Sequence, residues 1–224
     1  MRESFTFAEL SEQAKSRARD HYREQGQHDQ WWDAVYEDAV TIGALIGIEI
    51  EQDKKIVKGR EWYETSIWFR GFSSQGDGCC YDGKLHIDKL KGCVERLREH
   101  TGVGCTDDEL FKLAARGEEI YDEIIVQRTA LRLDGTPVWE INMMEVDLTD
   151  SVTITGSDRY SNTQTSLDAS SESIQNSLDE YVKDFADWIY KQLEAEDEHL
   201  NSDETIDEYL DDSEDTYDED GNIV

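Results

Sequence analysis

Apolar residues recur along this chain at two spacings, one typical of helices and one typical of strands. Apolar residues at every third or fourth position predict a first helix over residues 10–26 and a second over residues 30–44. The same period is clearest near the end of the chain, where it predicts a long helix over residues 174–199. Helices are therefore expected at both ends of the chain.

The middle of the chain shows the alternation of a β-sheet. Isoleucines at alternate positions from Ile46 to Ile50 indicate a half-buried strand. Residues 61–72 are rich in aromatic and β-branched side chains and predict another strand. Asp82-Gly83 lies between two short extended segments and is typical of a hairpin turn. We therefore expect antiparallel sheet here.

The next segments predict two more helices and a second hairpin. A helix is expected over residues 88–100, and a capping box from Thr106 to Glu109 indicates the start of another. Residues 138–148 and 151–155 read as two strands of a hairpin.

Together these segments predict an α+β fold, with an antiparallel sheet of about four or five strands packed by N-terminal and C-terminal helices. We expect one domain over residues 1–200, with an exposed polar loop at residues 157–173. Residues 201–224 are expected to add a short acidic helix, capped by Ser202, and a final turn docked on that domain.

Charge narrows the range of functions. The 224 residues include 53 Asp and Glu against 22 Lys and Arg, a formal net charge of -31. Phosphate contacts need Lys and Arg, so direct binding to nucleic acid or to an anionic membrane is not expected. Neither a membrane-spanning run nor a signal peptide is recognisable, which predicts a cytosolic protein whose partners are basic.

Cysteine chemistry is not expected to carry the function. Cys79, Cys80, Cys93 and Cys105 show no zinc-site spacing, and a cytosolic protein keeps such thiols reduced. A mixed site with nearby histidines is the alternative, but small apolar core residues are the simpler reading. We expect no metal, no cofactor and no catalytic residue.

One glycine-rich loop is a candidate for ligand binding. Residues 73–78, with the sequence SSQGDG, could bring backbone amides close to a phosphate. The loop matches neither the Walker pattern nor the dinucleotide fingerprint. A tight turn whose Asp77 holds its own backbone is favoured, and an enzyme that uses this loop with Cys79 or His86 remains an alternative.

The end of the chain combines acids with large apolar residues. Residues 195–224 contain no Lys or Arg. Residues 218–221, with the sequence DEDG, resemble the middle of an EF-hand loop, but its bidentate Glu would fall beyond Val224. Weak, diffuse cation binding is therefore expected in place of a calcium site.

The spacing of these acids suggests a charged binding surface. A helix with two carboxylates per turn carries about one charge per 2.7 Å of its axis, which lies between duplex DNA and a single strand. We predict a partner-binding surface of carboxylates from three segments. Its residues are Glu194, Glu196, Asp197, Glu198, Asp203, Glu204, Asp207, Glu208, Asp211, Asp212, Glu145 and Asp147.

The carboxylate surface could thus mimic a nucleic acid, but two simpler explanations of the acidity compete with this one. Charge runs usually form solvated helix faces, and proteins of a halophilic cytosol are acidic and poor in lysine. Salt separates the cases, because a halophile protein should unfold in dilute buffer while a mimic should stay folded and lose its partner as salt rises.

Several stretches together resemble a group of small bacteriophage and prophage proteins. They are FAELSEQAK at residues 7–15, WWDAVYEDA at 31–39, GFSSQGDG at 71–78, LNSDETI at 200–206 and DEDG at 218–221. Most members are uncharacterised, and some carry an automatic antitoxin label. The resemblance implies phage origin and action in the host cytoplasm, and it transfers no catalytic residue. This chain departs from the group in the loop at 157–173 and in its acidic C-terminus.

The leading expectation is a phage counter-defence protein that is not an enzyme. Its carboxylates would occupy the nucleic-acid groove of a basic host protein, such as a CRISPR complex or a restriction enzyme. An antitoxin-like or host-regulating binder anchored by Trp31, Trp62 and Trp68 is the alternative. The oligomeric state is left open by the sequence.

Overall fold

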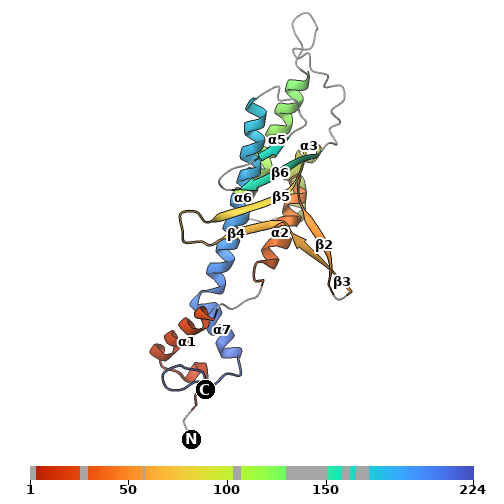
Figure 1. Cartoon of the computed structure of the whole chain (residues 1–224). Coiled ribbons are helices and arrows are strands. Elements are labelled where there is room, and N and C mark those ends of the chain that lie inside the picture. The colour runs from red at the N-terminus through yellow and green to blue at the C-terminus, as the bar shows by residue number, and fades with distance from the viewer. Residues whose placement is uncertain are drawn as a thin grey trace, which may run out of the picture. The chain divides into compact units, whose positions relative to one another are not determined.

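The computed structural model describes residues 4–25, 30–57, 59–102, 107–129, 151–157, 162–164 and 172–224. They form an α+β fold, as predicted (Figure 1). The helices are η1 (Phe7–Glu9), α1 (Glu12–Glu24), α2 (Asp33–Leu45), α3 (Ile87–Leu90), α4 (Cys93–Thr101), α5 (Asp108–Thr129), α6 (Glu172–Leu200) and α7 (Asp203–Asp212). The strands are β1 (Ile48–Ile50), β2 (Gln52–Val57), β3 (Arg60–Thr65), β4 (Ile67–Arg70), β5 (Gly78–His86), β6 (Ser151–Ser157) and β7 (Asn162–Gln164).

The chain divides into two compact units. The terminal unit contains Met1–Asp33 and Leu193–Val224, and the sheet unit contains Ala34–Gln192. The sequence predicts a boundary near residue 200, whereas the contacts divide the chain at residues 33 and 192. The first helices of the chain thus belong with its last one, and α7 packs on η1 and α1.

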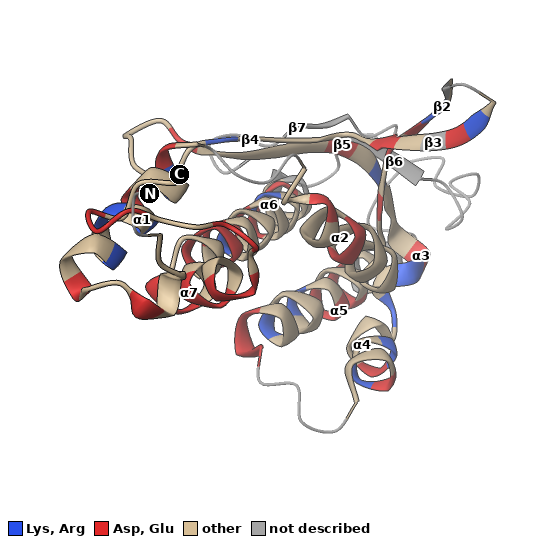
Figure 2. Ribbon diagram, turned by 90° about the horizontal axis from the view of Figure 1, so that it is seen from below, with Lys and Arg blue, Asp and Glu red and all other residues tan. Residues whose placement is uncertain are grey.

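Strand β5 is the centre of the sheet unit. Strand β6 pairs with one edge of it, and β7 pairs with β6. Strand β4 pairs with the first half of the other edge, and β1 pairs with the second half. The result is a five-stranded antiparallel sheet. Helices α2, α5 and α6 lie on one face of it, which Figure 2 shows with the strands seen edge-on.

A ring of three backbone hydrogen bonds marks the point where two strands leave this sheet. Glu51 N–H donates to Asp82 O at 2.9 Å, Asp82 N–H to Ser66 O at 3.1 Å, and Ser66 N–H to Glu51 O at 2.9 Å. Beyond the ring, β2 and β3 pair with each other as a separate two-stranded sheet. We name this hairpin, residues 52–65, the β-arm.

The predicted hairpin turn at Asp82-Gly83 is wrong. Strand β5 runs through both residues without interruption. Gly83 faces Ile50 of β1, and a Cβ atom on it would lie 2.3 Å from Glu49 O. The glycine is therefore required by the close approach of two strands and not by a turn.

The apolar stripe predicted for the long C-terminal helix is confirmed. Leu178, Val182 and Phe185 of α6 are fully buried. Two buried tyrosines tie the helix to the rest of the sheet unit: Tyr81 OH donates to Val182 O at 3.1 Å, and Tyr181 OH donates to Ile46 O at 2.7 Å. These bonds satisfy hydroxyls that burial would otherwise leave without partners.

The helix predicted over residues 88–100 is broken in two. Gly92 adopts a left-handed conformation, with φ +71°, between α3 and α4. Helix α5 begins where predicted, and its cap is Asp107, whose carboxylate accepts the Leu110 N–H at 2.9 Å. Thr106, the first residue of the predicted capping box, lies outside the described residues.

The second predicted hairpin is described only in part. Strand β6 coincides with the predicted strand at residues 151–155. Residues 138–148 lie outside the described residues, as does most of the loop predicted at 157–173. Within that loop, Asn162–Gln164 forms strand β7, so the loop prediction is wrong there.

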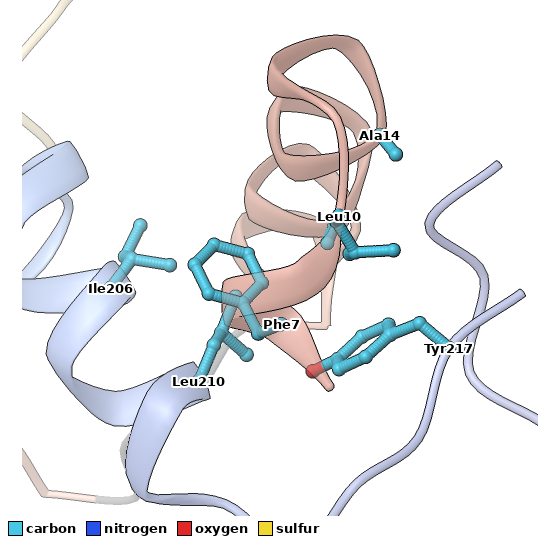
Figure 3. Close-up of a cluster of buried hydrophobic side chains, with 7 residues drawn as sticks. Phe7, Leu10, Ala14, Ile206, Leu210 and Tyr217 are labelled. Carbon is cyan, nitrogen blue, oxygen red and sulfur yellow. The ribbon is translucent and has the colours of Figure 1, made fainter. Parts of the chain in front are cut away.

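The terminal unit has a hydrophobic core of its own (Figure 3). Phe7 packs edge-on against Tyr217, with ring centroids 6.1 Å apart. Phe5 and Tyr217 also exchange two backbone hydrogen bonds of 2.9 Å each, so the two ends of the chain are joined. The buried residues are Phe7, Leu10, Ala14, Ala18, Ile206, Leu210 and Tyr217.

Candidate functional site

Helix α7 forms as its sequence predicts, with a cap at Ser202. The Ser202 hydroxyl accepts the Thr205 N–H at 3.2 Å, which satisfies one of the free amides at the helix start. Ile206 and Leu210 are buried in the core of the terminal unit. Because they lie four positions apart, they fix which side of the helix faces inward.

Four acids lie on the opposite, solvent-exposed side of α7. Glu204 and Glu208 are one turn apart, and Asp211 and Asp212 are each about one turn beyond Glu208. All four are exposed, and none forms an ion pair with a described residue. We name this group the acidic face.

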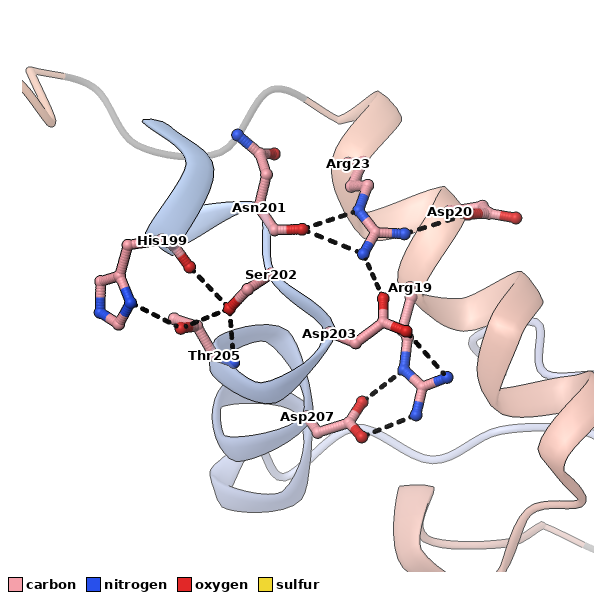
Figure 4. A network of polar contacts seen from close by, with 9 residues as sticks. All are labelled: Arg19, Asp20, Arg23, His199, Asn201, Ser202, Asp203, Thr205 and Asp207. Atoms are coloured by element: carbon pink, nitrogen blue, oxygen red, sulfur yellow. Dashed lines mark hydrogen bonds and ion pairs between the residues drawn. The ribbon is translucent and has the colours of Figure 1, made fainter. Parts of the chain in front are cut away.

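Two other acids of α7 are bound by arginines of α1 (Figure 4). Arg19 Nε and Nη2 donate to the two carboxylate oxygens of Asp207 at 2.6 Å each. Arg23 donates to Asp203 at 2.5 Å and to Asn201 O at 3.0 and 3.1 Å. The hydrogen bond from Arg23 lowers the pKa of Asp203, and the bond to Asp207 raises the pKa of Arg19. Both acids therefore hold α7 in place.

The acids at the end of α6 do not share one face. Glu198 is exposed, whereas Glu194, Glu196 and Asp197 are half-buried. Burial raises the pKa of Asp197, and the neighbouring Glu198 raises it further. Asp197 and Glu198 both lie about one turn beyond Glu194, whereas Glu196 points to the other side of the helix. The two predicted carboxylates at residues 145 and 147 lie outside the described residues.

The acidic segment after α7 is held by its own hydrogen bonds. The Asp218 carboxylate accepts the Asp220 N–H and the Asn222 N–H at 3.0 Å each, and these bonds contribute to lowering its pKa. Arg17 of α1 donates to Asp220 at 2.5 Å. Gly221 has φ +90°, and a Cβ atom on it would lie 2.2 Å from Ala14 O. The residues likened to an EF-hand loop thus fasten the chain end to α1.

A pocket in the terminal unit lies beside these elements and was not predicted. It has a volume of about 240 Å³ and is lined by residues of α1, α7 and the chain end. The rings of Tyr22 and Tyr209 are in contact there, with centroids 4.8 Å apart and planes tilted by 47°, and His21 contacts Gln25 at 2.7 Å. The apolar residues of the C-terminal tail, among them Tyr209 and Ile223, were the signal in the sequence that such a surface exists. We name it the terminal pocket.

The glycine-rich loop at residues 73–78 binds its own backbone. One oxygen of the Asp77 carboxylate accepts the Ser73 N–H at 2.8 Å and the Ser74 N–H at 2.6 Å. Gly71 has φ +54°, and a Cβ atom on it would lie 2.8 Å from that oxygen. This geometry agrees with the prediction that the loop is a tight turn held by Asp77.

Cys79 and His86 do not meet at one site. They stand at opposite ends of β5, about 23 Å apart along an extended strand. Cys79 is buried, and His86 pairs with Glu49 at 2.8 Å. Burial of Cys93, which donates to Ala114 O, raises its pKa to about 11. Cys79 and Cys93 thus behave as the predicted apolar core residues.

The described part of the chain holds neither a metal-binding cluster nor a membrane-spanning helix. No group of three or more His, Cys, Asp or Glu side chains in those residues is arranged to hold a metal ion. Among the helices that the structure describes, none has the length and apolar character that a bilayer crossing requires.

Comparison with known proteins gives one family. No curated protein and no solved structure matches the chain. The model of a family described as "Domain of unknown function (DUF8835)" matches residues 31–203, which is more than half of the chain. The matched range includes the whole sheet unit, while helix α1 and all but the first residue of α7 lie outside it. The chain belongs to the DUF8835 family.

Proposed function

We propose that this protein is a phage counter-defence protein that works by binding and not by catalysis. Its acidic face would occupy the nucleic-acid-binding surface of a basic host protein in the host cytoplasm. A CRISPR complex or a restriction enzyme is the class of target. Phage origin rests on the resemblance of several sequence stretches, and the mode of binding rests on the geometry of α7.

The observation that carries the proposal is the spacing of four carboxylates on one helix, none of which forms an ion pair with a described residue. Glu208, Asp211 and Asp212 follow Glu204 within eight residue steps, or about 12 Å along the axis. Four charges over that length give about one per 3–4 Å, close to the 3.4 Å per phosphate of a single nucleic-acid strand. A basic groove that binds phosphates at this spacing could bind the acidic face.

The scaffold beneath the acidic face supports the same proposal. The terminal unit contains 22 Asp and Glu against 5 Lys and Arg. Three of those five, Arg17, Arg19 and Arg23, pair with acids of α7 or of the chain end. The cations thus stabilise the scaffold against its own repulsion while leaving the outward acids free for a partner.

The experiment neutralises the acidic face without touching the inner salt bridges. A variant with Glu204→Gln, Glu208→Gln, Asp211→Asn and Asp212→Asn is compared with the original protein for inhibition of DNA or RNA binding by a purified effector. Asp203 and Asp207 stay unchanged because their loss would loosen α7 itself. We expect the variant to lose inhibition, and we expect rising salt to weaken inhibition by the original protein.

A matched control removes the same charge elsewhere. Glu37→Gln, Asp38→Asn, Glu99→Gln and Asp122→Asn neutralise four exposed acids of the sheet unit. This variant should inhibit as strongly as the original protein. Equal loss in both variants would show that net charge alone matters, and undiminished inhibition by the first variant would refute the acidic face as the binding surface.

An antitoxin-like or host-regulating binder is the second candidate, favoured by one exposed aromatic residue. The Trp68 side chain is 52% exposed on β4. Trp31 is half-buried, and the Trp62 side chain lies outside the described residues. Binding through Trp68 should tolerate high salt and fail in Trp68→Gln, which separates this function from the first.

A further inference from the structure

Exposed apolar side chains gather in two places in the described part of the chain. Five of the six large hydrophobic residues that are most exposed lie either on the β-arm or at the end of the terminal unit. Contiguous exposed apolar surface commonly marks an interaction site. The residues are Ile56 and Tyr63 on the β-arm, Tyr209, Ile223 and Val224 in the terminal unit, and Trp68 outside both groups.

The β-arm presents its two apolar residues on the same face. Tyr63 pairs with Lys54, and Ile56 pairs with Glu61, so all four side chains point to one side of the hairpin. Ile56 is 73% exposed and Tyr63 is 53% exposed. Lys54 Nζ lies 2.6 Å from Glu61 and braces the two strands beside them. A two-stranded hairpin is marginally stable alone, so a partner on this face would stabilise it.

The terminal pocket has the size and lining to receive such a face. Its volume of about 240 Å³ exceeds that of a single aliphatic side chain, and Tyr22, Tyr209 and Ile223 supply apolar walls. Asp215 adds a carboxylate to the lining. Glu208, Asp211 and Asp212 follow or adjoin Tyr209 in sequence and are exposed and unpaired with described residues.

Charge favours the β-arm over the other surfaces of this protein as the segment that binds in the terminal pocket. The terminal unit carries 22 acids against 5 cations, so most of another copy, which is itself acidic, would be repelled. The β-arm carries four Lys or Arg against three Asp or Glu. It combines exposed apolar residues with a net charge that is not negative.

We propose that the β-arm of one copy binds in the terminal pocket of a second copy. Ile56 and Tyr63 would contact Tyr22, Tyr209 and Ile223. The contact joins two different surfaces and is therefore heterologous, and its small size predicts weak, concentration-dependent association. Three residues of the acidic face adjoin the pocket, but the inference does not depend on the proposed function, because self-association is measured without any host protein.

Analytical ultracentrifugation of the full chain over a wide concentration range tests this contact. The original protein should associate, and Ile56→Asp should weaken self-association about tenfold or more, because it removes one buried aliphatic side chain and adds a charge. Ile223→Asp, in the pocket, should do the same. Ala115→Asp is the matched control, since it adds the same negative charge at an exposed position of α5 outside both surfaces. Circular dichroism verifies that each variant is folded.

Mixing the two defective variants gives the sharpest result. The Ile56→Asp chain keeps its pocket, and the Ile223→Asp chain keeps its β-arm, so the mixture should associate where neither variant does alone. Three outcomes would overturn the proposal. The first is an original protein that is monomeric at every concentration, which leaves the pocket and the β-arm to other partners, and the second is association that survives Ile56→Asp. The third is failure of the mixture to associate, which would indicate contact between like surfaces.

Discussion

The Arg19 guanidinium and the Asp207 carboxylate face each other through two hydrogen bonds of 2.6 Å, although 188 positions separate the residues in the sequence. Arginine supplies this forked geometry and lysine cannot. The pair lies at the boundary between the inner and outer sides of α7. It therefore reinforces the rotation of the helix that burial of Ile206 and Leu210 sets.

Arg19→Lys should loosen α7. The Arg19 side chain is 14% exposed and that of Asp207 is 32% exposed, so the pair is partly shielded from water. Loss of the second hydrogen bond should cost about 1 kcal/mol. Hydrogen exchange of the α7 amides measures this locally. Arg98→Lys is the control, because Arg98 lies 3.8 Å from Glu95 with both side chains exposed, and its effect should be within about 0.5 kcal/mol.

Acid should weaken the attachment of α7 through Asp203. The hydrogen bond from Arg23 holds the pKa of Asp203 below its usual 3.8. A carboxyl group with a lowered folded-state pKa stabilises the fold above its unfolded-state pKa, and this contribution disappears as pH falls through the folded-state pKa. Asp203→Asn should therefore be less stable than the original protein at pH 7 and equal to it in strong acid. A difference that stays constant with pH would contradict this assignment.

Gly221→Ala should detach the chain end from α1. Gly221 has φ +90°, and the new Cβ atom would lie 2.2 Å from Ala14 O, so the variant suffers both backbone strain and a collision. Gly59→Ala is the matched control, since Gly59 has φ +79° with no atom within 4 Å of the new Cβ. The control should cost about 1–2 kcal/mol at its own site, and Gly221→Ala should cost more. Thermal unfolding and α1 hydrogen exchange compare them.

Tyr217→Phe should leave the terminal unit as stable as before or more stable. Among the described residues, the buried Tyr217 hydroxyl has no hydrogen-bond partner within normal distance, and the nearby Ser213 hydroxyl donates to Leu210 O. Removing an unsatisfied hydroxyl while keeping the ring against Phe7 should gain up to about 1 kcal/mol. A clear loss of stability in urea unfolding would show that Ser213 accepts the phenolic proton.

Local patterns in the sequence predicted the helices better than the sheet. The stripe of α6 and the Ser202 cap of α7 depend on residues within one or two turns, and both predictions are confirmed. The Asp82-Gly83 signal was misread because a hairpin turn and a strand crossing both favour glycine. Only the approach of Glu49, 34 positions away, distinguishes them.

The sequence also does not predict which acids of α7 pair with arginines and which face solvent. Asp203, Asp207 and Glu208 have similar side chains and similar spacing, so composition could not separate them. Burial of Ile206 and Leu210 sets the phase of the helix, but the arginines that pair with the inner acids are contributed by α1, near the other end of the chain. A single sequence carries no local trace of such a pairing.

Because the terminal unit contains segments from both ends of the chain, it can fold only late in synthesis. During synthesis, α1 leaves the ribosome long before α7 is made. Arg19 therefore cannot pair with Asp207 until the intervening sheet unit has been synthesised. A chain cut before Asp203 would keep nearly all of its family-matched residues yet lack the charged helix. The acidic face is therefore present only on chains whose translation has continued through α7.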